Sequence, residues 1–338
     1  MTVQASSIES ENLPDPGKTQ GEPEEVAGRS PTQLAIGRFR KDRLSMVSFV
    51  VVVLVLVAAI AAPILVHLGV LDPYTYHNSG KGNLLDENTL PKGGFGGISW
   101  SHPLGVEPGT GRDALSRFWY GITFSLVIGL LACLIAVVLG AILGIIAGFS
   151  RSWADTIIGR AIDLTLSFPQ TLMLLALSST GLLLITDYTP IPSGPMAQAT
   201  YAILVLGIFG WPATARVVRG QVLSIREREF IDAAVLLGAS RWRIYFKEIL
   251  PNLWAPLLVL FTLTMPAYVS AEAALSYLGV SIKPPTPTLG NVLRDSLQYA
   301  QVDFIYFLIP ALLIAVIVVS FNLLGDGLRD ALDPKSNR

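Results

Sequence analysis

Residues 118–150, FWYGITFSLVIGLLACLIAVVLGAILGIIAGFS, contain no charged side chain and would be apolar on every side of a helix. At a rise of 1.5 Å per residue, about 20 apolar residues form a helix that crosses the roughly 30 Å hydrocarbon core of a bilayer. A helix without a polar face is typical of a segment that contacts lipid. The stretch therefore predicts a membrane-spanning helix that is longer than one crossing needs.

The rest of the chain repeats this pattern. Six charge-free stretches are long enough to span a bilayer, at residues 46–66, 118–150, 164–186, 188–215, 249–271 and 304–325. Only 14% of all residues are charged, whereas soluble domains carry about 25%. We therefore expect an all-α membrane protein with six transmembrane helices within residues 46–328. Prolines predict kinks in the third, fifth and sixth spans, at Pro169, Pro266 and Pro310.

The distribution of basic residues predicts the orientation of the bundle. Cytoplasmic connections carry an excess of Lys and Arg, and with the N-terminus inside, sixteen of them would be cytoplasmic and six external, leaving out two in the N-terminal tail. Both termini are therefore predicted to be cytoplasmic, with residues 329–338 as a short tail. Residues 71–117 become an external loop.

The segment before the first span divides into two parts. Residues 1–33 are acidic and rich in Pro, Gly, Ser and Glu, a composition that predicts disorder. Residues 34–45 mix apolar and basic side chains and predict an amphipathic helix along the inner membrane surface. A simple basic flank before the first span is the alternative interpretation.

The cytoplasmic connection at residues 221–251 is long and has the pattern of two short helices. Ser224 and Glu227 fit a capping box that would begin the first helix. Gly238 can adopt the left-handed conformation that ends it. Ser240 can then cap a second helix, which Pro251 would end as the chain re-enters the membrane.

This predicted helix–turn–helix carries aromatic and aliphatic residues beside several arginines. Such a surface must be buried against something. It could pack on the inner ends of its own bundle, or it could dock into a cleft of a soluble partner. Periodicity alone does not choose between the two.

The order Asp232-Ala233-Ala234, three residues, Gly238, then Leu250-Pro251 resembles the EAA loop of bacterial ATP-binding-cassette (ABC) import permeases. In that family the leading residue is usually Glu, and an Ile commonly stands at the position of Glu248. The resemblance implies a coupling helix seated in a groove of a separate ATPase subunit. The residues that it assigns to ATPase coupling are Asp232, Ala233, Ala234, Gly238, Ala239, Ser240, Trp242, Arg243, Tyr245 and Phe246.

Three further segments resemble the C-type subunit of dipeptide and oligopeptide permeases. They are HPLGVEPGTGRDALSR at residues 102–117, EAALSYLGVSIKPPTP at residues 272–287 and NLLGDGLRDALDP at residues 322–334. The likeness runs collinearly over residues 34–334, and the glycine-rich stretch at residues 80–97 looks like an insertion.

This resemblance implies a type I ABC-importer permease (MetI-like) fold in the cytoplasmic membrane of a bacterium. It also implies peptide import by alternating access. The implied partners are a second, homologous permease of the B type, two ABC ATPase domains and an extracytoplasmic substrate-binding protein.

No enzyme chemistry is expected in this chain. Gly17-Lys18-Thr19 lacks the first glycine of a phosphate-binding loop, so ATP and Mg²⁺ would be used by the partner subunits and no cofactor is expected here. His67, His77 and His102 show no ligand spacing, so we predict no metal site and no catalytic residue. The net charge of −1 argues against a nucleic-acid partner.

Glu272 is the one carboxylate within the outer part of the fifth span. An ionised carboxylate at the centre of a membrane costs about 2.5–3.5 kcal/mol, so it should face protein or water. It could lie on the substrate path and bind the amino terminus of a peptide, or it could pair with a backbone group or an arginine at the external rim.

Three alternative functions are compatible with a six-helix bundle. A related ABC permease could carry nickel or another small solute instead of peptides. An ion-driven secondary transporter would require charges or paired broken helices at mid-membrane, which these spans do not show. A scaffold that only recruits a partner through its loop would need no cavity.

Overall fold

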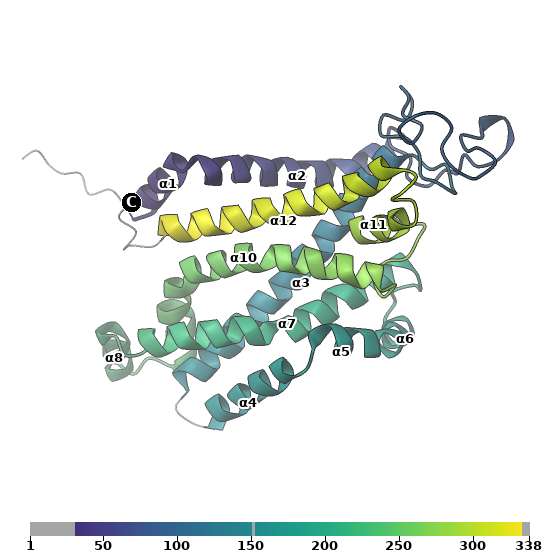
Figure 1. The fold of residues 1–338 in the computed structure, drawn as a ribbon. Coiled ribbons are helices and arrows are strands. Elements are labelled where there is room, and N and C mark those ends of the chain that lie inside the picture. Colours follow the sequence, from purple (N-terminus) through teal and green to yellow (C-terminus); the bar gives the residue numbers. More distant parts are fainter. Residues whose placement is uncertain (1–30, 151–152, 333–338) are drawn as a thin grey trace, which may run out of the picture.

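The computed structural model describes residues 31–150 and 153–332, and within these ranges the chain is mainly helical. The predicted disordered tail up to residue 30 and residues 333–338 lie outside the described part. Among the described residues, five helices are long and apolar enough to cross a membrane, and a bent helix pair can make a sixth crossing. The long helices are α2 (Arg43–His67), α3 (Ala114–Phe149), α7 (Pro195–Ile225), α10 (Leu250–Tyr277) and α12 (Phe304–Leu332). In Figure 1, α2, α12, α10 and α7 run side by side, and α3 crosses behind them.

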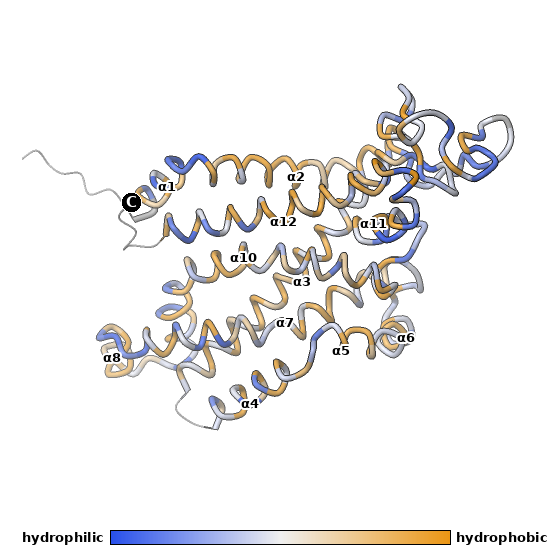
Figure 2. The backbone as a smooth tube through the Cα atoms, in the orientation of Figure 1, coloured by the Kyte–Doolittle hydropathy of each residue, from blue (hydrophilic) through white to orange (hydrophobic). Residues whose placement is uncertain are grey.

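The hydropathy of the chain follows this arrangement. Apolar residues line the long helices, and polar residues gather at the loops on both ends of the bundle (Figure 2). The core around α3 packs Cys133, Met265 and Ile317 from three different helices. Every predicted span except the third is therefore matched by one long helix, although the fourth, predicted from residue 188, begins only at Pro195 in α7.

The third span differs from the sequence prediction. A single span was expected at residues 164–186, but the chain forms α4 (Trp153–Ser167), α5 (Gln170–Ala176) and α6 (Ser178–Tyr188). Pro169 separates α4 from α5 with an extended backbone, because proline cannot donate the hydrogen bond that would continue a helix. The α5 and α6 axes then meet at a bend of 54°.

The closest packing in the bundle joins α3 to α7 and depends on glycine. Gly140, Gly144 and Gly148 recur every four residues on α3, so they share one face of the helix. A Cβ at Gly144 would lie 2.8 Å from the carbonyl oxygen of Ala215, and one at Gly148 would lie 2.7 Å from Cβ of Val222. Small residues at this spacing let two membrane helices approach closely.

Both ends of the bundle carry short elements beside the long helices. On the side of the N-terminus, α1 (Pro31–Lys41) is separated from α2 by Asp42, which accepts hydrogen bonds from the backbone N–H groups of Leu44 and Ser45. Residues 31–33, assigned to the disordered tail, therefore begin a helix. At the opposite end lie η1 (Gly80–Gly82) and α11 (Leu289–Leu297). Near the C-terminus, α12 continues to Leu332, so residues 329–332 are helical as well.

Pro266 and Pro310 lie inside helices that continue past them, α10 and α12. Of the three prolines predicted to kink a span, only Pro169 stands at a break between helices, and the third span has a further break at Leu177, between α5 and α6.

Candidate coupling loop and outer ion-pair cluster

The connection between α7 and α10 begins later than predicted. Ser224 belongs to the last turn of α7, and the next helix, α8 (Glu229–Leu236), has Arg228 as its N-cap residue without a side-chain hydrogen bond. The predicted Ser224–Glu227 capping box is therefore wrong, because the preceding helix continues through its first residue.

The turn after α8 is as predicted. Gly238 has φ of +76°, a conformation that favours glycine. The N–H of Ala239 donates to the carbonyl of Ala234, and that of Gly238 donates to Val235, which is the hydrogen-bond pattern of a Schellman motif. Ser240 then accepts a hydrogen bond from the backbone N–H of Arg243 at 3.4 Å. The predictions for Gly238 and Ser240 are confirmed.

The second helix of the loop does not end at Pro251. It starts with α9 (Arg241–Arg243), continues through the π-helical turn η2 (Ile244–Ile249) and merges into α10. Pro251 occupies the first turn of α10, where a missing N–H is tolerated. The loop is thereby joined to a membrane-spanning helix without a break.

One face of this loop packs against the bundle. Ile231, Ile244 and Ile249 are buried in a cluster with Val218 and Val222 of α7. Tyr245 adds a ring contact with Phe149 at the end of α3, with centroids 5.4 Å apart. This half of the loop matches the interpretation in which the loop packs on its own helices.

The other face of the loop is apolar and exposed. Leu236 and Leu237 are each 87% exposed, Trp242 is 66% exposed and Phe246 is 56% exposed. The rings of Trp242 and Phe246 stack with centroids 5.9 Å apart. Figure 1 shows α8 at the end of the bundle, beside the end of α7. We call residues 226–249 the coupling loop and these four side chains its apolar rim.

The residues that the sequence resemblance assigned to coupling lie together in this loop. Of these ten, Ala234, Ala239 and Tyr245 are half-buried, and the other seven are exposed. Asp232 and Tyr245 also border a hollow of about 320 Å³ with Arg226 and Arg241. Sequence reasoning left Leu236 and Leu237 out of the residues assigned to coupling, although two consecutive leucines directly before the helix-ending Gly238 could have indicated an apolar contact surface.

Glu272 lies at the other end of the bundle and is completely buried. Its carboxylate accepts hydrogen bonds from the hydroxyls of Ser125 and Ser276 at 2.7 Å each, and from Ser281 at 3.2 Å. These hydroxyls come from α3, α10 and the segment after α10. In this conformation the geometry favours a structural role, in which Glu272 holds neighbouring segments together, over a place on the substrate path. Its partners are serine hydroxyls, whereas a backbone group or an arginine was expected.

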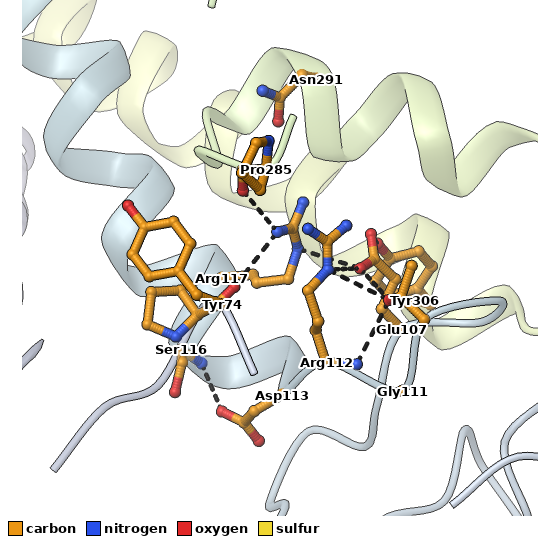
Figure 3. A network of polar contacts seen from close by, with 12 residues as sticks. Tyr74, Glu107, Gly111, Arg112, Asp113, Ser116, Arg117, Pro285, Asn291 and Tyr306 are labelled. Atoms are coloured by element: carbon orange, nitrogen blue, oxygen red, sulfur yellow. Dashed lines mark hydrogen bonds and ion pairs between the residues drawn. The ribbon is translucent and has the colours of Figure 1, made fainter. Parts of the chain in front are cut away.

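A second buried carboxylate, Glu107, anchors the external loop to the bundle (Figure 3). Arg112 Nε donates to its Oε2 at 2.6 Å, and the hydroxyl of Tyr306 in α12 donates to its Oε1 at 2.8 Å. Arg117, fully buried at the start of α3, lies 3.4 Å from the same carboxylate and donates to the carbonyl of Pro285 at 3.1 Å. We call Glu107, Arg112, Arg117 and Tyr306 the outer cluster.

The two arginines of the outer cluster favour the ionised form of its carboxylate. Burial raises the pKa of Glu107, but the positive charges of Arg117 and Arg112 and the hydrogen bonds outweigh it, so the pKa lies below its ordinary value. Nearby Asp295 in α11 behaves in the opposite way, because burial and the charge of Glu107 raise its pKa. The cluster thus holds one carboxylate ionised and disfavours a second.

With this geometry in place, comparisons with known proteins identify the family. Residues 140–338 match the family described as "binding-protein-dependent transport system inner membrane component", and residues 30–91 match "N-terminal TM domain of oligopeptide transport permease C". The chain therefore belongs to the family of binding-protein-dependent transport permeases.

The chain is also similar over most of its length to permease proteins that are named for peptide transport. The chain is 34% identical to the dipeptide transport system permease protein DppC of Alkalihalophilus pseudofirmus, over 95% of each chain. It is also 34% identical to the oligopeptide transport system permease protein OppC of Bacillus subtilis, over 89% of this chain and 88% of the relative.

A solved structure shows the same fold. The MetNI methionine ABC transporter in an inward-facing conformation matches with a TM-score of 0.51 at 20% identity, over 65% of this chain and 97% of that one. The predicted type I ABC-importer permease fold is thereby confirmed.

Proposed function

We propose that this chain is the permease subunit of an ATP-driven importer that carries peptides, and that its coupling loop docks onto a separate ATPase. The peptide substrate is supported by relatives that span nearly the whole chain and are named for dipeptide and oligopeptide transport. The docking role is supported by the apolar rim, because exposed apolar patches of this kind mark surfaces that bind a partner. The observation that carries the proposal is the pair of leucines, each 87% exposed, beside a left-handed glycine.

The partners follow from the same reasoning. A second, homologous permease of the B type would complete the substrate pathway, two ABC ATPase domains would bind and hydrolyse ATP with Mg²⁺, and an extracytoplasmic binding protein would deliver the substrate. The excess of basic residues at the end that carries the coupling loop supports cytoplasmic termini in a bacterial cytoplasmic membrane.

The coupling loop has a direct mechanical connection to the bundle. Helical residues run from Arg241 to Tyr277 without interruption, so a push on the Trp242 side of the loop acts on a membrane-spanning helix. Arg226 fixes the start of the loop by donating to the carbonyl of Gly148 in α3 at 2.9 Å. ATP-driven closure of the ATPase pair would therefore bias the bundle between inward-open and outward-open states.

Replacing Gly238 with Val tests the docking role. Valine is strongly disfavoured at φ of +76°, so the turn between α8 and α9 should change while the spans still insert. We expect normal membrane yield but loss of ATPase co-purification. Gly220→Val in α7 is the matched control, since a Cβ there meets nothing within 4 Å and φ is not positive. Co-purification of the Gly238→Val protein at the wild-type level would refute the docking role.

Uptake by a strain that lacks this chain tests the substrate class separately. Restored uptake of labelled di- or oligopeptides is expected on complementation with the wild-type chain. Restored nickel uptake without peptide uptake would identify the alternative solute class, and no restored uptake of any solute would favour the scaffold interpretation.

A further inference from the structure

An apolar groove lies at the same end of the bundle as the chain termini, between α1, the start of α2, α10 and the end of α12. Its volume is about 440 Å³, and its lining is almost entirely hydrocarbon. Half of its lining residues are large apolar side chains from α1, α2 and α12, namely Ile36, Phe39, Phe49, Leu328 and Leu332.

Close helix packing holds the walls of this groove in place. The rings of Phe39 and Phe49 contact each other edge to face, with centroids 6.2 Å apart. Gly327 of α12 lets α12 approach α2, because a Cβ there would lie 2.5 Å from Cβ of Ser45. The groove is therefore set by the backbone packing of three helices.

The groove opens where lipid is expected. Ile36 and Phe49, which line the groove, are 54% and 44% exposed, and α2 is the most apolar of the five candidate spans among the described residues. Hydrocarbon from the surrounding leaflet can therefore enter the groove without displacing polar side chains.

Basic side chains border the groove at one end. Arg40 contributes to its lining, and the last turn of α1 and the first residue of α2 together carry four basic residues, Arg38, Arg40, Lys41 and Arg43. Asp42 lies among them but accepts hydrogen bonds from two backbone N–H groups. On α12, Asp326 and Asp330 lie two residues before and after Leu328, so at 3.6 residues per turn they face roughly away from the groove. The charge beside the groove is therefore positive.

From this juxtaposition of a hydrocarbon-lined groove and a basic rim, we propose that the groove binds an anionic phospholipid. One acyl chain enters between α1 and α12, and the phosphate headgroup lies against Arg40 and Lys41. The placement in the inner leaflet relies on the proposed orientation, and the cytoplasmic leaflet is the one whose anionic lipids attract basic segments next to a membrane.

Lipid titration of the purified, assembled transporter in detergent tests this proposal. Phosphatidylglycerol and phosphatidylcholine with identical acyl chains are added, and bound lipid is counted by native mass spectrometry. Wild-type protein should retain phosphatidylglycerol preferentially. Arg40→Gln together with Lys41→Gln should weaken its binding about fivefold per residue removed, while the exposed external pair Lys283→Gln and Arg294→Gln should not. Ala35→Phe, which fills the groove, should weaken both lipids.

Three results would overturn the proposal. Equal retention of the two lipids by the wild-type protein would show that no anionic headgroup is recognised. Unchanged binding in the Arg40 and Lys41 double variant would remove the basic rim from the site. Stronger phosphatidylglycerol binding after deletion of residues 333–338 would show that the C-terminal segment of the chain is the normal occupant.

Discussion

The two ends of this bundle differ in what they bury, since the external end buries charged side chains and the opposite end exposes apolar ones. At the external end, the outer cluster places a carboxylate between two arginines, and its exposed fraction is only 3%. At the other end, the coupling loop leaves leucine and tryptophan side chains in contact with solvent. Buried charges are paired within the chain at one end, while apolar side chains are left uncovered at the other. Mutations should therefore affect folding at the external end and assembly at the coupling loop.

Glu107→Gln should have the largest effect on stability, because it leaves two buried guanidinium groups without their counter-charge. Breaking a buried ion pair costs about 3–5 kcal/mol. Unfolding can be followed with a thiol-reactive dye, since Cys133 is the single cysteine of the chain and is buried. Asp163→Asn is the control, because its ion pair with Arg216 is exposed, and such pairs contribute only about 0–1 kcal/mol. Equal stability of the two variants would show that the buried ion pairs of Glu107 do not stabilise the external end.

Changing Leu236 and Leu237 together to Ala should have the opposite outcome. The unfolding temperature should stay the same, while peptide uptake and ATPase co-purification fall at least about tenfold, as expected when interface anchors worth 1–2 kcal/mol are removed. Leu183→Ala with Leu184→Ala is the matched control, since that pair on α6 is 60% and 54% exposed. If both pairs reduced co-purification equally, the coupling loop would not be the specific contact.

Acid should destabilise the external end through Glu107. Its pKa is lower in the folded protein than the ordinary 4.5, so its contribution to stability is complete above that value and is lost as the pH falls through the folded pKa. The unfolding temperature of the wild-type protein should therefore fall more steeply below pH 4.5 than that of Glu107→Gln. Parallel curves for the two proteins would show that Glu107 does not titrate in this way.

Asp295→Asn should produce the smallest change, with a sign opposite to that of Glu107→Gln. Burial and the nearby Glu107 raise the pKa of Asp295 in the folded protein, so its ionised form is disfavoured there. Removing this charge should raise the unfolding temperature slightly at pH 7, and the gain should shrink as the pH falls and Asp295 becomes protonated. A loss of stability at pH 7 would mean that Asp295 has a favourable partner.

The sequence predicted those features that are set by local chemistry. Charge-free stretches identified every span except the third, which is broken into separate helices, and Gly238 and Ser240 predicted the turn of the coupling loop. Errors arose where neighbouring elements decided the outcome, since α7 continues through Ser224 and a π-helical turn carries the chain past Pro251. The role of Glu272 was also open in the sequence, because one of its serine partners, Ser125, is 147 residues away along the chain. The glycine repeat on α3 can be read from the sequence, but only the structure shows that these glycines allow α7 to approach closely.

Site-directed cross-linking from the coupling loop tests the central claim most directly. Leu237→Cys adds one exposed thiol to a chain whose native cysteine is buried, and a short bifunctional maleimide can then be applied to the assembled transporter. A cross-link from Leu237→Cys to the ATPase subunit, absent from a Leu183→Cys control, is the predicted result. If the thiol at position 237 reacts freely in the assembled transporter and captures no ATPase, the coupling loop does not dock there.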